Sequence, residues 1–290
     1  TKYFSVNSLL TGNRNGSGAV GTDAIAIGPN ATANGTNSIA VGRYANVSGV
    51  NGVAIGFNAQ SLACESVAIG SGAKVTGEHS YAIGYSTNVS GHISIAFGMS
   101  AEAHGHESLA LGSSAKTLSG ANYAIAQGVG AQAQGEYSIS QGYYTYAIGR
   151  NSIAQGHMAA ADGEGSISIG NTSLASNVSS VAIGNASNAT GPGAIAMGYE
   201  ANSLGRSSTA VGMLANASNN TASAFGYYAK ALGNASLAIG SFTTAAADGA
   251  MSIGDRAQVR GLNAMAIGML SNANGSGSIA QGVLANATGG

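Results

Sequence analysis

The sequence predicts an all-β parallel solenoid, and three observations lead to this prediction. Closing glycines recur every 14 residues from Gly28 to Gly282, with one spacing of 16 after Gly112. Each glycine ends a segment in which large and small residues alternate, as in residues 38–42 (Ser-Ile-Ala-Val-Gly). Each segment is five residues plus a glycine, which is the length of a strand. A fixed period of this kind is typical of a solenoid built from stacked coils.

Each repeat predicts two strands, when positions are numbered from its closing glycine. Positions −3 and −1 are large and apolar, such as Ile39 and Val41, whereas −4 and −2 are Ala or Ser in nearly every copy. This alternation with period 2 indicates a strand with a large face and a small face. After the glycine, +3 and +5 are small, as in Ala45 and Val47, and +4 is mostly polar. We therefore expect a coil of strand, turn, strand, turn.

The repeats define the domain organisation. Residues 1–21 precede the clean period and are interpreted as an N-terminal cap or lead-in, and residues 22–290 form one repetitive head of about 19 coils. The spacing of 16 comes from two extra residues, Leu118 and Ser119. We expect them at a corner, where an insertion does not break the strand ladder.

Composition excludes several classes of protein. Charged residues make up 7% of the chain and the net charge is −1. The sequence therefore lacks the excess of basic residues with which nucleic-acid-binding proteins contact phosphate groups. No apolar run approaches the ~18 residues of a membrane helix. No signal peptide is visible, so we expect a segment of a longer exported chain. The single cysteine, Cys64, allows no disulfide within one chain.

The first strand of each coil has two nonpolar faces, one large and one small. A coil has only one interior, so the second face suggests close approach of a neighbouring chain. The favoured arrangement places the Ile/Val face in the core, packed against the small residues at +3 and +5. The small face would then meet the partner chains; the reverse arrangement remains open. This small interface face includes Ala26, Ala40, Ala54, Ala68, Ala82 and Ala96.

Glutamine replaces the apolar residue at −1 in several coils. Gln127, Gln141 and Gln155 do so in three consecutive coils, and Gln281 does so once more. A buried glutamine must be hydrogen-bonded. We interpret the four as a polar layer of the core or trimer that sets the register, with pairing along the stack or across a symmetry axis. Coordination of an ion or ligand is the alternative.

The repeat resembles the YadA-like heads of trimeric autotransporter adhesins. Their motif, Asn-Ser-Val-Ala-Ile-Gly-x-x-Ser/Ala, matches residues 37–45 with only Val/Ile exchanges, and residues 66–73 and 180–187 match it closely. The resemblance implies a left-handed parallel β-roll of 14-residue coils and an obligate homotrimer. It also implies a non-enzymatic segment on the bacterial cell surface, which binds extracellular matrix proteins, host cells or abiotic surfaces. Membrane attachment would occur only through a C-terminal outer-membrane anchor that lies outside this sequence.

The sequence offers no catalytic constellation. The 11 acidic residues scatter along the predicted corners, and no cofactor is expected. The densest titratable cluster is His104, His106 and Glu107. We interpret it as a solvated corner rather than as a weak metal site, and we expect no bound metal.

Aromatic residues are the candidates for ligand binding. Tyr137, Tyr143, Tyr144 and Tyr146 cluster in two neighbouring coils. A sparser group contains Tyr227 and Tyr228, with Tyr199 and Phe242. Exposed aromatic side chains are common interface anchors, although these could instead cover a gap between chains. Repetition in a trimer would make such binding multivalent.

Two other functions fit a β-solenoid. An ice-binding solenoid would carry a regular Thr ladder, but position +4 is a mixture of Asn, Gln, Lys and Glu. A glycan-binding or polysaccharide-processing solenoid is the other alternative. The absence of a carboxylate cluster argues against glycan cleavage.

Overall fold

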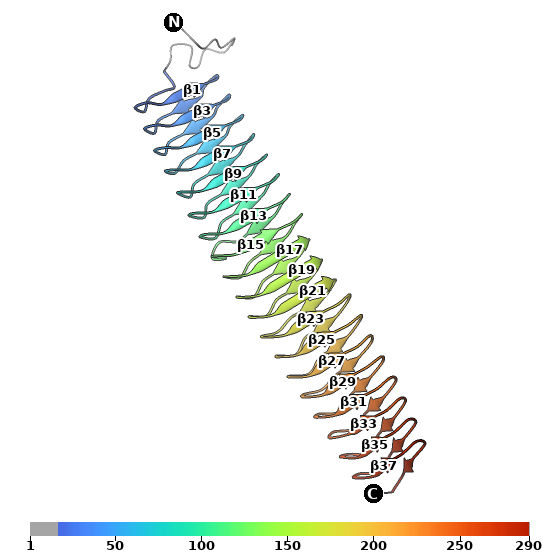
Figure 1. Cartoon of the computed structure of the whole chain (residues 1–290). Coiled ribbons are helices and arrows are strands. Elements are labelled where there is room, and N and C mark those ends of the chain that lie inside the picture. The colour runs from blue at the N-terminus through green and yellow to red at the C-terminus, as the bar shows by residue number, and fades with distance from the viewer. Residues whose placement is uncertain (1–16, 290) are drawn as a thin grey trace. The chain divides into compact units, whose positions relative to one another are not determined.

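The computed structural model describes residues 17–289, which fall into two compact units that divide between Tyr144 and Thr145. Each unit is built from short parallel strands that alternate along the chain between two sheets (Figure 1). Residues 1–16 of the predicted lead-in, residues 1–21, lie outside the described residues. In the described remainder, Ala19 forms a parallel bridge to Ala33. Residues 17–289 form no helix long and apolar enough to span a membrane.

The odd-numbered strands form one sheet of each unit, called here the apolar sheet. In the first unit it contains β1 (Ile25–Ile27), β3 (Ile39–Val41), β5 (Val53–Ile55), β7 (Val67–Ile69), β9 (Tyr81–Ile83), β11 (Ile95–Phe97), β13 (Leu109–Leu111), β15 (Ile125–Gln127) and β17 (Ile139–Tyr143). In the second unit it contains β19 (Ile153–His157), β21 (Ile167–Asn171), β23 (Val181–Ile183), β25 (Ile195–Met197), β27 (Thr209–Val211), β29 (Ser223–Phe225), β31 (Leu237–Ile239), β33 (Met251–Ile253), β35 (Met265–Ile267) and β37 (Ile279–Gln281).

The even-numbered strands form the second sheet of each unit, called here the polar sheet. In the first unit it contains β2 (Thr32–Ala33), β4 (Asn46–Val47), β6 (Gln60–Ser61), β8 (Lys74–Val75), β10 (Asn88–Val89), β12 (Glu102–Ala103), β14 (Lys116–Thr117) and β16 (Gln132–Ala133). In the second unit it contains β18 (Tyr146–Ala147), β20 (Ala160–Ala161), β22 (Leu174–Ala175), β24 (Asn188–Ala189), β26 (Asn202–Ser203), β28 (Asn216–Ala217), β30 (Lys230–Ala231), β32 (Thr244–Ala245), β34 (Gln258–Val259), β36 (Asn272–Ala273) and β38 (Asn286–Ala287).

The register of the strands follows the sequence period. Ala40 pairs with Ala54, the residue 14 positions later, and Asn46 pairs with Gln60 in the other sheet. At the insertion, Leu109 pairs with Ile125 and Lys116 with Gln132, so the step becomes 16 while both ladders continue. The two extra residues lie in the turn after β14, as predicted for a corner. The predicted parallel β-solenoid with 14-residue coils is confirmed.

The interior of the coil is filled by small side chains, so the favoured assignment of the strand faces is wrong. Ala40, Ala54, Ala68, Ala82 and Ala96 are completely buried inside the coil, and Ala26 packs partly buried against the same core. The large residues at −3 and −1 point outward instead. The reverse arrangement, which the sequence left open, is the one observed.

The physical reason for this reversal is the narrowness of the coil. Short connections with turns at Arg43–Tyr44 and Val50–Asn51 join consecutive strands of the two sheets. The bulkiest side chains that are fully buried are valine, threonine and serine, as at Val47 and Thr87. An isoleucine row would not fit in the same space without overpacking it.

The closing glycines are required by close contact between successive coils. Gly70 has a φ of +133°, a conformation that side chains disfavour, and a Cβ there would lie 2.1 Å from the carbonyl oxygen of Gly84. Most repeats have a second glycine at +7, and it also lies close to the next coil, since a Cβ on Gly77 would meet the carbonyl oxygen of Gly91. Its φ does not lie in the left-handed region, however, and the chain accepts Ala63 and Asn177 at this position. Only the closing position is glycine in every coil.

We therefore predict that Gly70→Ala destabilises the chain far more than Gly77→Ala. The first substitution combines a disfavoured φ with a backbone clash and should cost at least about 2 kcal/mol. The second, at +7 of the same coil, meets the next coil as closely but without a disfavoured φ, and the chain already accommodates Ala63 at this repeat position. Denaturant unfolding of both variants measures the difference, and equal losses would contradict this account of the closing glycine.

Candidate functional site

The outer surface of the apolar sheet is a face of half-exposed large side chains at −3 and −1, called here the apolar face. In the first unit Ile95 is 40% exposed and Phe97 55%. In the second unit Phe225 and Ile239 are each 38% exposed. Monomeric proteins rarely present apolar side chains in a contiguous patch of this kind, and such patches usually mark an interaction surface.

The glutamines predicted to form a polar layer lie on the apolar face, not in the coil core. Gln127 and Gln141 are exposed and aligned in register on β15 and β17, and Gln141 Nε2 donates a hydrogen bond to Gln127 Oε1 at 3.4 Å. Gln155 on β19 and Gln281 on β37 are exposed as well. The assignment to the coil core is therefore wrong, because that space accepts only small side chains. Pairing along the stack is observed for the first two glutamines.

The outer surface of the polar sheet carries hydrogen-bonding side chains at +4 and is called here the polar face. These side chains form hydrogen bonds between neighbouring coils. For example, Thr32 Oγ1 donates a hydrogen bond to Asn46 Oδ1 at 2.9 Å. Glu102 forms an ion pair with Lys116 in the next coil and lies 3.0 Å from His104 Nε2. Burial raises the pKa of the Glu102 carboxyl, but hydrogen bonds with Lys116 and His104 outweigh burial and hold it below its ordinary value.

We predict that Glu102→Gln lowers stability at neutral pH but not in acid. Because the folded-state pKa is depressed, the ionised carboxylate stabilises the fold above its unfolded pKa, and this contribution disappears as the pH falls through the folded pKa. The effect at neutral pH should be below about 1 kcal/mol, because the pair is partly exposed. Thermal unfolding across that pH range measures it, with Glu164→Gln, an exposed turn residue, as the control. An unchanged gap between variant and wild type at all pH values would refute the assignment.

Aromatic and histidine rings form a ladder along the +8/+9 corner of the first unit. The rings of His92 and His106 stack at 5.5 Å, and His106 meets Tyr123 at 6.1 Å. Of the cluster singled out in the sequence, His104 lies instead on the polar face, where Ser90 Oγ lies 2.7 Å from its Nδ1, and His106 lies 3.4 Å from Glu107. Residues 17–289 contain no group of three metal-ligating side chains.

The first tyrosine cluster is distributed over different surfaces. Tyr137 stacks on Tyr123 in the +8/+9 corner, with ring centroids 4.9 Å apart and planes 4° apart. Tyr143 and Tyr144 occupy the +1/+2 corner, with ring centroids 4.6 Å apart in an edge-on contact. Tyr146 is half-buried on β18 in the second unit. Proximity in sequence therefore does not place Tyr137 beside Tyr143, because the two lie at opposite corners of the coil.

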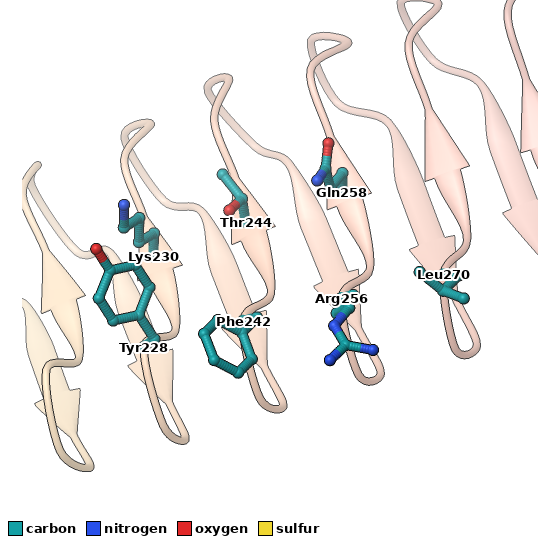
Figure 2. A pocket seen from close by; sticks show the side chains of 7 residues that line it. All are labelled: Tyr228, Lys230, Phe242, Thr244, Arg256, Gln258 and Leu270. Carbon is teal, nitrogen blue, oxygen red and sulfur yellow. The ribbon is translucent and has the colours of Figure 1, made fainter.

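Two members of the second aromatic group, Tyr228 and Phe242, line a groove of about 360 Å³ in the second unit (Figure 2). The ring of Tyr227 meets that of Phe242 at 4.9 Å, and the ring of Tyr228 lies 5.7 Å from Phe242. Lys230 and Arg256, which were not singled out from the sequence, also line the groove. Their positions in the repeat, +4 and +2, would have indicated that they share a surface with Tyr228 and Phe242.

The sequence matches the family model described as the YadA head domain repeat (2 copies) through most of both units. The matched residues are 19–45, 48–75, 76–101, 119–145, 147–173, 175–201, 189–215, 203–229, 217–243 and 245–271. A search of curated proteins finds no match.

Proposed function

The chain belongs to the YadA head domain family, and from this premise we propose that it is the adhesive, non-enzymatic head segment of a trimeric autotransporter on a bacterial cell surface. The observation that carries the proposal is the family repeat, which continues through both units and coincides with the coils of the solenoid. Members of this family have adhesin-like functions, and their head domains self-associate. Because successive coils stack in register, side chains at the same repeat position form rows on the surface, and such rows can bind a partner.

We place the contacts between three copies of this chain on the apolar face. Its half-exposed isoleucine, phenylalanine and methionine side chains would leave water on association, and that burial is the main driving force of such interfaces. The exposed pair Gln127 and Gln141 would lie within the same interface as a polar layer, where further hydrogen bonds across the symmetry axis would satisfy the amides.

The purified chain is expected to have a mass of about 84 kDa by light scattering, three times the 28.1 kDa of one chain. Ile239→Lys on the apolar face should weaken association by at least about tenfold, because it places a charge in an apolar contact. Ala160→Lys on the polar face is the matched control and should leave the trimer intact. A folded 28.1 kDa monomer of the wild-type chain would contradict the trimer.

The adhesive contacts are proposed at the exposed tyrosines. Tyr143 and Tyr144 at one corner, and Tyr227 and Tyr228 in the second unit, are 38–49% exposed and offer flat amphipathic rings. Tyr137 and Tyr146 are weaker candidates, because the first stacks within the ring ladder and the second is half-buried. Three copies of each would bind extracellular matrix proteins, host cells or abiotic surfaces with avidity.

Retention of chain-coated beads on matrix protein, cell layers and plastic tests this function. We expect wild-type beads to be retained, and each double substitution, Tyr143→Ser/Tyr144→Ser or Tyr227→Ser/Tyr228→Ser, to reduce retention several-fold because avidity multiplies the loss. Tyr85→Ser, which removes an exposed tyrosine outside both groups, serves as the control. Absence of wild-type retention on all three surfaces would count against an adhesin.

A further inference from the structure

The groove of the second unit is formed by two parallel rows of side chains (Figure 2). One row comes from the turns at +2 and the other from the polar strands β30, β32 and β34 at +4. The rows contain Tyr228, Phe242, Arg256 and Leu270, and Lys230, Thr244 and Gln258, respectively. Lys230 pairs in register with Thr244, and Thr244 with Gln258, so successive side chains are one strand spacing apart. At about 4.8 Å per spacing, the groove follows the stack for roughly 14 Å.

The row at +2 begins with two aromatic side chains that pack against neighbouring rings. Tyr228 and Phe242 are 38% and 42% exposed, so part of each ring remains accessible to a ligand. Phe242 is supported from the side by Tyr227, whose ring meets it edge-on at 87°. Flat, open rings of this kind stack against the apolar face of a pyranose ring, and little side-chain entropy is lost because the rings are already packed.

Positive charge alternates with these rings along the groove. Lys230 Nζ lies 4.5 Å from the centre of the Tyr228 ring, and Arg256 Cζ lies 5.8 Å from that of Phe242. The intervening coil contributes Phe242 and Thr244 and no cation. The two cations therefore come from coils two spacings apart, which is about 10 Å along the stack.

The polar groups around Arg256 leave it available to a ligand. Its Nη1 is 3.7 Å from Asp255 Oδ2, a long and exposed ion pair that contributes little. Arg260 Nη2 donates to Gln258 Oε1 at 2.7 Å and thereby orients the Gln258 side chain. The Gln258 amide nitrogen remains as a further donor toward the groove.

We propose that this groove binds an acidic polysaccharide whose carboxylates recur on every second sugar. One sugar of an extended chain is about as long as one coil spacing, so stacked sugars on Tyr228 and Phe242 would bring alternate carboxylates to Lys230 and Arg256. A single-stranded nucleic acid fits less well, because it carries a charge on every unit and the chain has a net charge of −1. The inference rests on the proposed adhesive function, whose ligand class it names.

The groove stays accessible in the proposed trimer. Lys230, Thr244 and Gln258 lie on the polar face, on the opposite side of the coil from the apolar face. Association through the apolar face would therefore leave three open grooves per assembly, all running along the same direction. Weak binding at each groove would then combine into avidity for a polymer.

Titration calorimetry of the whole 290-residue chain with three defined probes tests the proposal. The probes are a short oligosaccharide of alternating uronic acid and N-acetylhexosamine, a neutral oligosaccharide of equal length, and a single-stranded oligodeoxynucleotide. We expect the acidic oligosaccharide to bind most tightly, and added salt to weaken its binding. Tyr228→Ser and Arg256→Gln should each reduce its affinity by at least about tenfold.

Lys74→Gln is the matched control, because Lys74 occupies the same +4 position on β8 but Gly72, not an aromatic residue, stands at +2. This variant should bind like the wild type, and thermal unfolding verifies that all variants remain folded. Equal affinity of wild type, Tyr228→Ser and Arg256→Gln would overturn the proposal, as would tighter binding of the oligodeoxynucleotide or no binding of the acidic probe. If beads still adhere in any of these cases, the glycan site alone fails and the adhesive function stands.

Discussion

The narrow interior of the coil is the constraint on which the rest of the structure depends. Short turns join the two sheets at both corners, and the fully buried side chains between them are alanine, serine, threonine and valine. The large side chains at −3 and −1 of the described coils point outward instead, as at Ile39 and Ile95. A fold of this kind buries little apolar surface per coil within one chain, so an outer apolar face is available for other copies of the chain.

Close stacking has a second consequence, because each surface position becomes a row. Residues 14 apart lie side by side, so one side chain type repeated in the sequence becomes a ladder in space, as with the hydrogen bond between Gln127 and Gln141 or the stacked rings of Tyr123 and Tyr137. Rows of this sort suit extended polymers better than compact ligands. The groove of Tyr228 and Phe242 is formed by side chains at +2 and +4 of consecutive coils, without an inserted loop.

The electrostatics of the surface are local. With 10 basic and 11 acidic residues, the chain generates no strong overall field, and charges act on near neighbours in adjacent coils. Glu102 with Lys116 is one such pair, and Asp248, whose pKa is lowered by hydrogen bonds from the Asn234 backbone and amide, is another. Placement along the stack therefore decides which charges meet. Lys230 and Arg256 stand out because both lie over aromatic rings that line the groove.

The sequence alone determined the coil, its 14-residue register and the corner position of the Leu118–Ser119 insertion, because spacing and alternation are properties of the chain itself. It also led to the family, through the motif of residues 37–45. Alternation could not determine which strand face is inside, since either face is regular. Only the folded coil shows that Ala40 is buried and that Ile39 is not. The tertiary structure likewise separated Tyr137 from Tyr143 and brought Lys230 and Arg256 to the rings of Tyr228 and Phe242, because contacts across coils depend on position within the repeat rather than on distance along the chain.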